Sequence, residues 1–300
     1  MVALQIPNLT IESTLKTEIS MSIKTIAVSL VDIERQDAVM NAAFSLAASH
    51  DAHLLGVYTV PSPLGMAVPA SFGAISADMD NSRYFEDKLD DVKARFDDAA
   101  RRYGVRAEWR RADGETGLLA DAMLKHAPFA DLIVAGQVNS STSNTIEPDF
   151  VERLVLESGR PVLIIPNMGD FKSVGTNVIV GWNATREAMR AAFDAIPVMK
   201  DAKRVELLWA NARDEPDRAG DLPGAELAAV LARHDIKIFA RSISSSDLAP
   251  ADALLNEAAD NGADLIVIGA YGHSRLREFV FGGVTRSLLQ SMTAPVLMSH

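Results

Sequence analysis

The residues best suited to chemistry lie in a glycine-rich segment, Gly269–Arg286, which reads GAYGHSRLREFVFGGVTR. The segment follows a short apolar run and leads into a helical pattern. We therefore expect it to join a strand to a helix at the carboxyl edge of a parallel sheet, where ligands bind in open α/β folds. Glycines allow sharp turns and close approach, and the free N–H groups at a helix start favour phosphate oxygens. The pattern predicts a site for a phosphate-bearing ligand.

Two side chains in this segment have alternative interpretations. The hydroxyl of Thr285 can cap the following helix or donate to a phosphate. His273 can contact a phosphate, but a solvated loop histidine whose backbone alone matters is the interpretation we favour. The segment contains no Lys, which a Walker A loop requires after its glycines, and it does not match the G-x-G-x-x-G dinucleotide fingerprint.

An internal repeat organises the elements around this segment. Ala130–Gly136 (ADLIVAG) recurs as Ala263–Gly269 (ADLIVIG), and Arg160–Ile164 (RPVLI) recurs as Ala294–Met298 (APVLM). The spacing between the two matched segments is nearly the same in both copies. We infer that the chain is duplicated, because repeated motifs at a repeated interval are the signature of tandem units.

Each copy alternates short apolar runs with amphipathic helical patterns, which indicates βαβ units and a parallel sheet. The runs do not alternate apolar with polar residues, as is typical of strands covered on both faces. We predict an α/β fold with two tandem, doubly wound, mostly parallel-sheet domains. The expected boundaries are an extension over 1–20, a first domain over 21–166 and a second over 172–300.

Composition narrows the classes of function. The 300 residues carry a net charge of -11, with 48% hydrophobic and 23% charged residues, as in a globular protein. An acidic surface disfavours nucleic acid, and no apolar run reaches the length of a membrane span. Without cysteine, thiolate metal sites and cysteine nucleophiles are excluded. We expect a cytoplasmic protein with neither a nucleic-acid nor a membrane partner.

The spacing Gly-x2-Gly-x9-Gly resembles the ATP-binding signature of the universal stress protein family. Gly269, Gly272 and Gly282 fall on its three glycines, whereas Gly283 stands where the family usually has Ser or Thr. The resemblance is strong in the second copy and moderate in the first. It implies a Rossmann-like fold of the adenine nucleotide alpha hydrolase type, binding ATP, AMP or ADP, with Mg²⁺ helping to neutralise the phosphates.

The same resemblance places an acidic residue near the adenine, where this chain has Asn183. An amide can still donate and accept hydrogen bonds at an adenine edge without charge. The neighbouring Trp182 can stack on adenine or pack in the core, and Thr185 is expected to N-cap the next helix. The predicted nucleotide-binding residues are therefore Gly269, Gly272, His273, Gly282, Gly283, Val284, Thr285 and Asn183.

The first copy departs from the pattern, and we expect its site to be degenerate. No glycine pair follows Gly136, and Asp149 and Glu152 stand near the helix start, where they would repel phosphates. Asp32 is expected at the end of the first strand, which alone makes no site.

Three functions follow from these observations. The first is a nucleotide-responsive stress or regulatory protein. The second is a slow ATPase, although the segment shows no catalytic base and no acidic metal pair, so we expect neither catalytic residues nor a protein metal site. The third is an interaction protein whose closing strands, Pro161–Ile165 and Pro295–Met298, pair within the chain as a pseudo-dimer or between chains as a homodimer.

Overall fold

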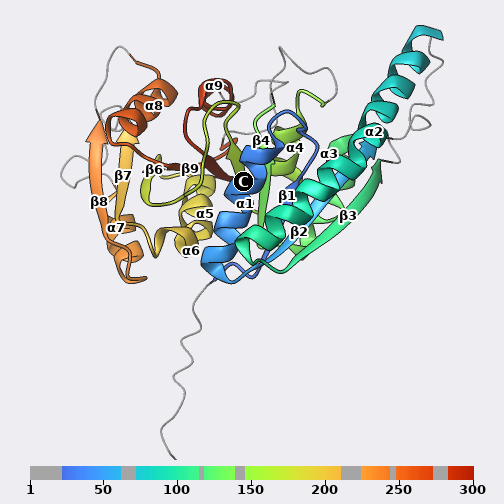
Figure 1. Ribbon diagram of the computed structural model, residues 1–300. Helices are drawn as coiled ribbons and strands as arrows, with labels where there is room; N and C mark the ends of the chain where they lie inside the picture. The colour runs from blue at the N-terminus through green and yellow to red at the C-terminus, as the bar shows by residue number, and fades with distance from the viewer. Residues whose placement is uncertain are drawn as a thin grey trace, which may run out of the picture.

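The computed structural model describes residues 22–61, 72–114, 118–138, 146–210, 224–243, 248–272 and 283–300. Its strands form a single ten-stranded sheet in which the two halves of the chain lie side by side. Figure 1 shows the first half in blue to green and the second in yellow to red. None of the described helices is both long and apolar enough to cross a membrane.

The first half contributes five strands and the helices between them. In chain order the elements are β1 (Thr25–Ser29), α1 (Gln36–His50), β2 (His53–Pro61), α2 (Phe72–Tyr103), β3 (Ala107–Gly114), α3 (Leu119–Leu124), a 3₁₀ turn (Ala127–Phe129), β4 (Leu132–Gly136), α4 (Phe150–Glu157) and β5 (Val162–Ile165).

The second half repeats this order with small changes. Its elements are β6 (Asn177–Gly181), α5 (Arg186–Asp194), α6 (Ile196–Met199), β7 (Arg204–Ala210), α7 (Ala225–Ala232), β8 (Ile238–Ile243), α8 (Pro250–Asp260), β9 (Leu265–Gly269), α9 (Gly283–Ser291) and β10 (Val296–Ser299).

The order of strands across the sheet is β3-β2-β1-β4-β5-β10-β9-β6-β7-β8. Neighbouring strands are parallel within each half, and the only antiparallel pair between these strands joins β5 to β10. Each half therefore has the doubly wound order in which the chain starts near the middle and builds outward in both directions. This confirms the predicted tandem α/β fold with a mostly parallel sheet.

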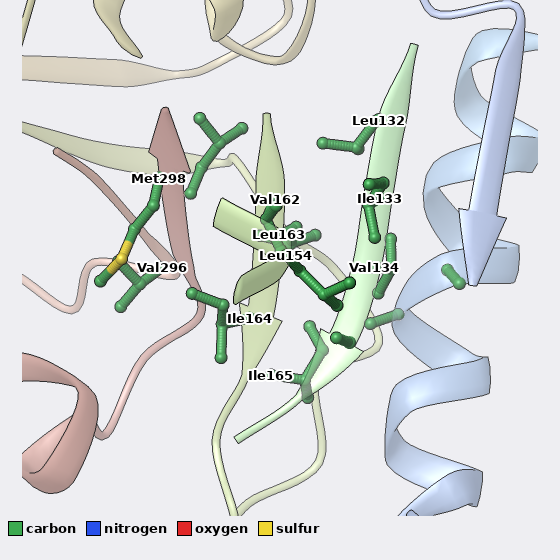
Figure 2. Packing of buried hydrophobic residues seen from close by; sticks show 14 of the residues in the cluster. Leu132, Ile133, Val134, Leu154, Val162, Leu163, Ile164, Ile165, Val296 and Met298 are labelled. Carbon is green, nitrogen blue, oxygen red and sulfur yellow. The ribbon is translucent and has the colours of Figure 1, made fainter. Parts of the chain in front are cut away.

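The closing strands of the two halves pair with each other around an approximate two-fold axis. Leu163 lies opposite Leu297, and each is the second residue after the repeated proline of its own half. Figure 2 shows β5 between β4 and β10, with Ile164 and Val296 among the packed side chains. The expectation that these strands pair within the chain is confirmed, and the pairing gives both strands a neighbour on each side.

Burial explains why the strands are almost continuously apolar. All four residues of β5, and the first four of β4 and β9, are buried. A parallel sheet covered by helices on both faces leaves no solvated face for polar residues to occupy. One continuous core therefore runs from Ile26 in β1 to Met298 in β10.

Candidate functional site

Three segments of the second half converge at the carboxyl end of its central strands. They are the end of β9, the turn from β6 into α5, and the first turn of α9. The backbone N–H of Tyr271, just after β9, points to Oγ1 of Thr285 in α9 at 3.5 Å. Gly269 and Gly272 lie against the start of α5. The predicted glycine segment thus meets two helix N-termini, the ends of a helix that favour anions.

Gly269 ends β9 and packs against the backbone of α5. A Cβ atom at this position would lie 2.7 Å from Cα of Ala188, and closer still to the nitrogen of Ala188 and the carbonyl carbon of Glu187. Those atoms belong to a helix backbone and cannot rotate away. The absence of a side chain at Gly269 is therefore required by the packing of the domain itself.

Gly272 has a different surrounding. A Cβ atom there would lie 3.0 Å from Oε2 of Glu187 and 3.5 Å from Oγ1 of Thr185. Between the two glycines, Tyr271 has a φ of 58°, a left-handed conformation that is uncommon for a non-glycine residue. The chain thus turns sharply after β9 and passes directly over the first turn of α5.

Glu187 is a buried carboxylate in this site that sequence reasoning missed. The residue is 6% exposed, and its Oε1 forms an ion pair with Arg186 at 3.1 Å. An acidic residue in the first turn of a helix is ordinarily solvated and favoured by the helix dipole. Its burial follows from the packing of the turn around Gly272 on α5, which no local sequence pattern reveals.

The first turn of α9 presents both an open and a buried side. Gly283 is exposed, and a Cβ atom there would meet no atom of the described residues within 4 Å. Val284 is also exposed, whereas Thr285 is 4% exposed with its hydroxyl turned to the backbone of Tyr271. Backbone N–H groups at a helix start lack intrahelical partners, so the open side of Gly283 can accept an anion.

Asn183 and Thr185 form a hydrogen-bonded turn between β6 and α5. Oδ1 of Asn183 accepts from the N–H of Thr185 at 3.2 Å and from its hydroxyl at 2.8 Å. Oγ1 of Thr185 in turn accepts from the N–H of Ala188 at 3.2 Å. The predicted N-cap at Thr185 is confirmed, and the amide oxygen of the exposed Asn183 is engaged by Thr185.

Trp182 belongs to the core. It is 9% exposed, and its ring meets that of Trp209 edge to face at a centroid distance of 6.4 Å. An aromatic pair of this geometry stabilises the fold by its own contact as well as by burial. Of the two interpretations of Trp182, the structure favours packing.

Six of the eight predicted binding residues lie in the described part of the chain, and the structure brings them to one edge of the sheet. These are Asn183, Gly269, Gly272, Gly283, Val284 and Thr285. His273 and Gly282 fall outside the described residues, so their contribution stays a prediction.

The corresponding edge of the first half carries carboxylates of its own. Asp149 stands at the N-cap position of α4, and Glu152 lies in its first turn, as predicted. In addition, Oε1 of Glu147 accepts from the backbone N–H of Leu119 and, at 3.3 Å, of Ala120 at the start of α3. Negative groups of the protein thus lie at both helix starts, which disfavours a phosphate there.

Asp32 was expected at the end of the first strand, and it lies three residues after β1, one position beyond the counterpart of Asn183. Ile26 pairs with Leu132 and Val178 pairs with Leu265, the matching strand residues of the two copies. Counting along β1 and β6 from these pairs places Val31 opposite Asn183 in the alignment of the halves. The first copy has a longer connection before its helix, and this length difference was not visible in the apolar pattern.

Asp32 instead lies against Gly136. A Cβ atom at Gly136 would be 2.7 Å from Oδ2 of Asp32, while Oδ1 accepts from the N–H of Arg35 at 3.2 Å. Burial raises the pKa of this carboxyl to about 6, against the lowering effect of that hydrogen bond. The space that α5 backbone fills beside Gly269 is filled beside Gly136 by an aspartate side chain.

Comparison with known proteins shows which protein family this part of the chain resembles. Residues 184–300 match the model of the universal stress protein family. The match covers most of the second half, from the turn before α5 to the end of the chain's last strand, so this half is similar to universal stress proteins. The match includes β9, the glycine segment and α9, and therefore every predicted site residue except Asn183, which lies one residue before it.

Two curated relatives carry the same family name. Universal stress protein Slr1230 of Synechocystis is 23% identical over 188 residues, which cover 61% of this chain and 62% of that protein. Universal stress protein YxiE of Bacillus subtilis is 43% identical over 49 residues, covering 16% of this chain and 33% of the relative. The chain therefore matches less than two thirds of the length of either relative.

A solved structure matches nearly the whole chain. The universal stress protein from Archaeoglobus fulgidus aligns with a TM-score of 0.66 and 17% identity, over 91% of this chain and 95% of that one. At this identity the likeness concerns the fold. It shows that the two universal stress protein-like halves in one chain form a known tandem architecture.

Proposed function

We propose that the second half binds an adenine nucleotide, ATP or alternatively AMP or ADP, and that the protein acts as a nucleotide-responsive stress or regulatory protein. We place its action in the cytoplasm. The phosphates would lie at the open side of Gly283, and Mg²⁺ would help to neutralise them. The contacting residues would be Gly269, Gly272, His273, Gly282, Gly283, Val284, Thr285 and Asn183. The observation that carries the proposal is the convergence of the glycine turn after β9 with two helix starts.

The electrostatics of the site support a phosphate at α9 rather than at α5. The start of α5 already has a hydroxyl cap from Thr185 and the buried carboxylate of Glu187 beside it. The start of α9 has an exposed Gly283 and no acidic residue in its first turn. An anion is therefore stabilised by the dipole and N–H groups of α9, whereas Glu187 disfavours its approach to α5.

The turn around Asn183 would contact the adenine ring of the nucleotide. Since Oδ1 of Asn183 accepts two hydrogen bonds from Thr185, the amide N–H₂ group is the part that can face a ligand. An amide donor fits the ring nitrogens of adenine, which are acceptors. The side chain thus supplies recognition without the negative charge found at this place in the family.

The proposal concerns binding, and hydrolysis is the second candidate. Phosphoryl transfer requires positioned metal ions and a group that orients the nucleophile. Glu187 is the one buried carboxylate that the described residues bring to this turn, and its Oε1 is engaged by Arg186. A binding protein with at most slow turnover is therefore the function that the site supports best.

Calorimetric titration with ATP, ADP, AMP and adenosine in the presence of Mg²⁺ tests the proposal. We expect one nucleotide per chain. The variant Gly283→Asp should lower ATP affinity at least about tenfold, because it places a carboxylate where the phosphates lie. The matched variant Gly283→Ala retains the N–H and the neutral charge, and should change the affinity by about threefold or less.

Adenosine shows whether the Gly283→Asp variant weakens binding through charge repulsion of the phosphates or by distorting the rest of the site. It has no phosphate, so its affinity should be the same in Gly283→Asp and the wild type. No binding of any adenine nucleotide at millimolar concentration would reject the proposed function. In the same preparation, ADP release from ATP that is no faster in the wild type than in Gly283→Asp would exclude the ATPase.

A further inference from the structure

The last turn of α9 is held by a residue from the first half. Nε2 of Gln137 donates to the carbonyl of Leu289 at 2.6 Å, while its Oε1 accepts from the N–H of Asn167 at 2.8 Å. The side chain is 8% exposed. The last four carbonyls of a helix have no intrahelical partner, so Gln137 satisfies a group that would otherwise be buried without a hydrogen bond.

The first half makes this contact with a helix of the second half, but the described part of the second half makes no equivalent contact in return. Gln137 and Ala270 are counterparts, because each directly follows the glycine that ends its strand, Gly136 in β4 and Gly269 in β9. A methyl group cannot donate to a carbonyl, so Ala270 makes no equivalent contact with α4. The two halves are related by an approximate two-fold axis in backbone, but not in the polar contacts between them.

A second asymmetry lies in the middle of the same junction. Glu152 in α4 and Arg286 in α9 are also counterparts, since each stands nine residues before the repeated proline of its half. The positive charge of Arg286 opposes the rise in the pKa of Glu152 that burial causes, and both charges act on the hydroxyl of Tyr271.

Identical copies could not make this contact. Residues that face their own counterparts across a two-fold axis carry the same charge in a symmetric dimer and repel each other. Here the duplicated positions have opposite charges, and the glutamine is present in one copy alone. Both differences favour the pairing of this first half with this second half.

The helix held in this way is short and carries the start of the proposed phosphate site. α9 has nine residues, and an isolated helix of that length is marginal in water, so its order depends on contacts with the rest of the protein. Gln137 contacts its last turn, and Arg286, which interacts with Glu152, lies in its first half.

We infer that the first half is a positioning partner for α9, in which Gln137 holds the helix whose N-terminus receives the phosphates of the second half, and in which the opposite charges of Glu152 and Arg286 favour the same arrangement. The inference rests on the proposed function for its ligand, but the hold on α9 exists without ligand and can be measured alone. The inference assigns a role to the first half, whose own corresponding edge carries carboxylates where a phosphate would lie.

Hydrogen exchange of ligand-free protein, followed by mass spectrometry, tests the hold. In Gln137→Met the amides of α9 should exchange about fivefold faster than in the wild type, which corresponds to the loss of one hydrogen bond. Gln290→Met makes the same chemical change at an exposed position of α9 itself, and should leave the exchange unchanged. Exchange in α4 should be unaffected in both variants. Equal exchange of α9 in the two variants would overturn the inference.

Charge reversal provides a second test that does not touch the core. Glu152→Arg and Arg286→Glu should each accelerate exchange in α9, and the double variant should restore protection, because the pair is then inverted but still opposite. A double variant no better protected than the single variants would show that the two residues do not interact. If the two residues contributed only to overall stability, their variants would change exchange throughout the chain, and the double variant would not restore protection in α9 selectively.

Nucleotide titration then separates this inference from the proposed function. If both are correct, Gln137→Met lowers nucleotide affinity about fivefold while Gln290→Met does not. If the wild type binds no nucleotide but the exchange pattern holds, the proposed function fails and the hold stands. If nucleotide binds and α9 exchange is insensitive to Gln137→Met, the inference fails alone.

Discussion

The three described glycines of the glycine-rich segment are predicted to tolerate a methyl group very differently. At Gly269 an added Cβ would strike the backbone of α5, including Cα of Ala188 at 2.7 Å. At Gly272 the nearest atom, at 3.0 Å, is the end of the Glu187 side chain, which can move. At Gly283 no atom in the described part of the chain lies within 4 Å. The structure therefore predicts a graded series for one chemical change within a single motif.

The magnitudes follow from packing and helix propensity. Overpacking against atoms that cannot rotate away costs roughly 3 kcal/mol or more, so Gly269→Ala should be destabilising by at least that amount. Gly272→Ala should cost about 1 kcal/mol, since only a side chain must shift. Gly283→Ala lies in the first turn of α9 and should be neutral or stabilising by up to about 1 kcal/mol, because alanine favours the helix.

Urea unfolding followed by tryptophan fluorescence measures this series. Trp182 and Trp209 form a buried pair in the second half and report on its unfolding. The midpoints should fall in the order Gly283→Ala, Gly272→Ala, Gly269→Ala, from highest to lowest. If Gly269→Ala unfolds at the same urea concentration as Gly283→Ala, the close approach of α5 to β9 is wrong, and Gly269 would instead be required by the ligand.

Three further predictions concern other parts of the chain. Asp32→Asn should raise the free energy of unfolding by up to about 3 kcal/mol at about pH 8 and have little effect at about pH 4. Burial raises the pKa of this carboxyl from 3.8 to about 6, so the charged form destabilises the fold as pH rises through that range; equal gains at both pH values in thermal unfolding would contradict this. Thr185→Ala should cost about 1 kcal/mol through loss of the N-cap to Ala188, with Thr185→Ser near wild type in the same assay. Leu163→Ala and Leu297→Ala should each cost about 2–5 kcal/mol, and the double variant less than their sum because the two residues face each other; strict additivity would refute that contact.

The sequence by itself determined the architecture and predicted the location of the candidate site. The repeat of ADLIV and PVL segments showed that the chain is duplicated, and the apolar runs between helical patterns showed the parallel sheet. The repeat is visible by comparing one part of the sequence with another. The strands and helices are visible locally, since period and composition within a dozen residues distinguish a covered strand from an amphipathic helix. The glycine segment marked the carboxyl edge of β9 because its position in the order of elements was readable without any long-range contact.

The roles of individual side chains were decided by the tertiary structure. Gly269 serves the packing of α5, Glu187 is buried although it lies in a polar stretch, and Trp182 meets Trp209 rather than open space. Each depends on a contact between residues that different elements bring together. The one-residue offset between Asp32 and the counterpart of Asn183 has a related reason, since a longer connection before the helix does not change the hydrophobic pattern.

The relation between the halves was visible in the sequence only as a similarity. That β5 pairs with β10 and that Gln137 reaches the end of α9 follow from how the two similar halves meet, as does the effect of the Arg286 charge on the pKa of Glu152. A duplicated sequence specifies each fold through its local pattern, but the opposite charges and the single glutamine acquire meaning only when the two-fold arrangement places counterparts face to face.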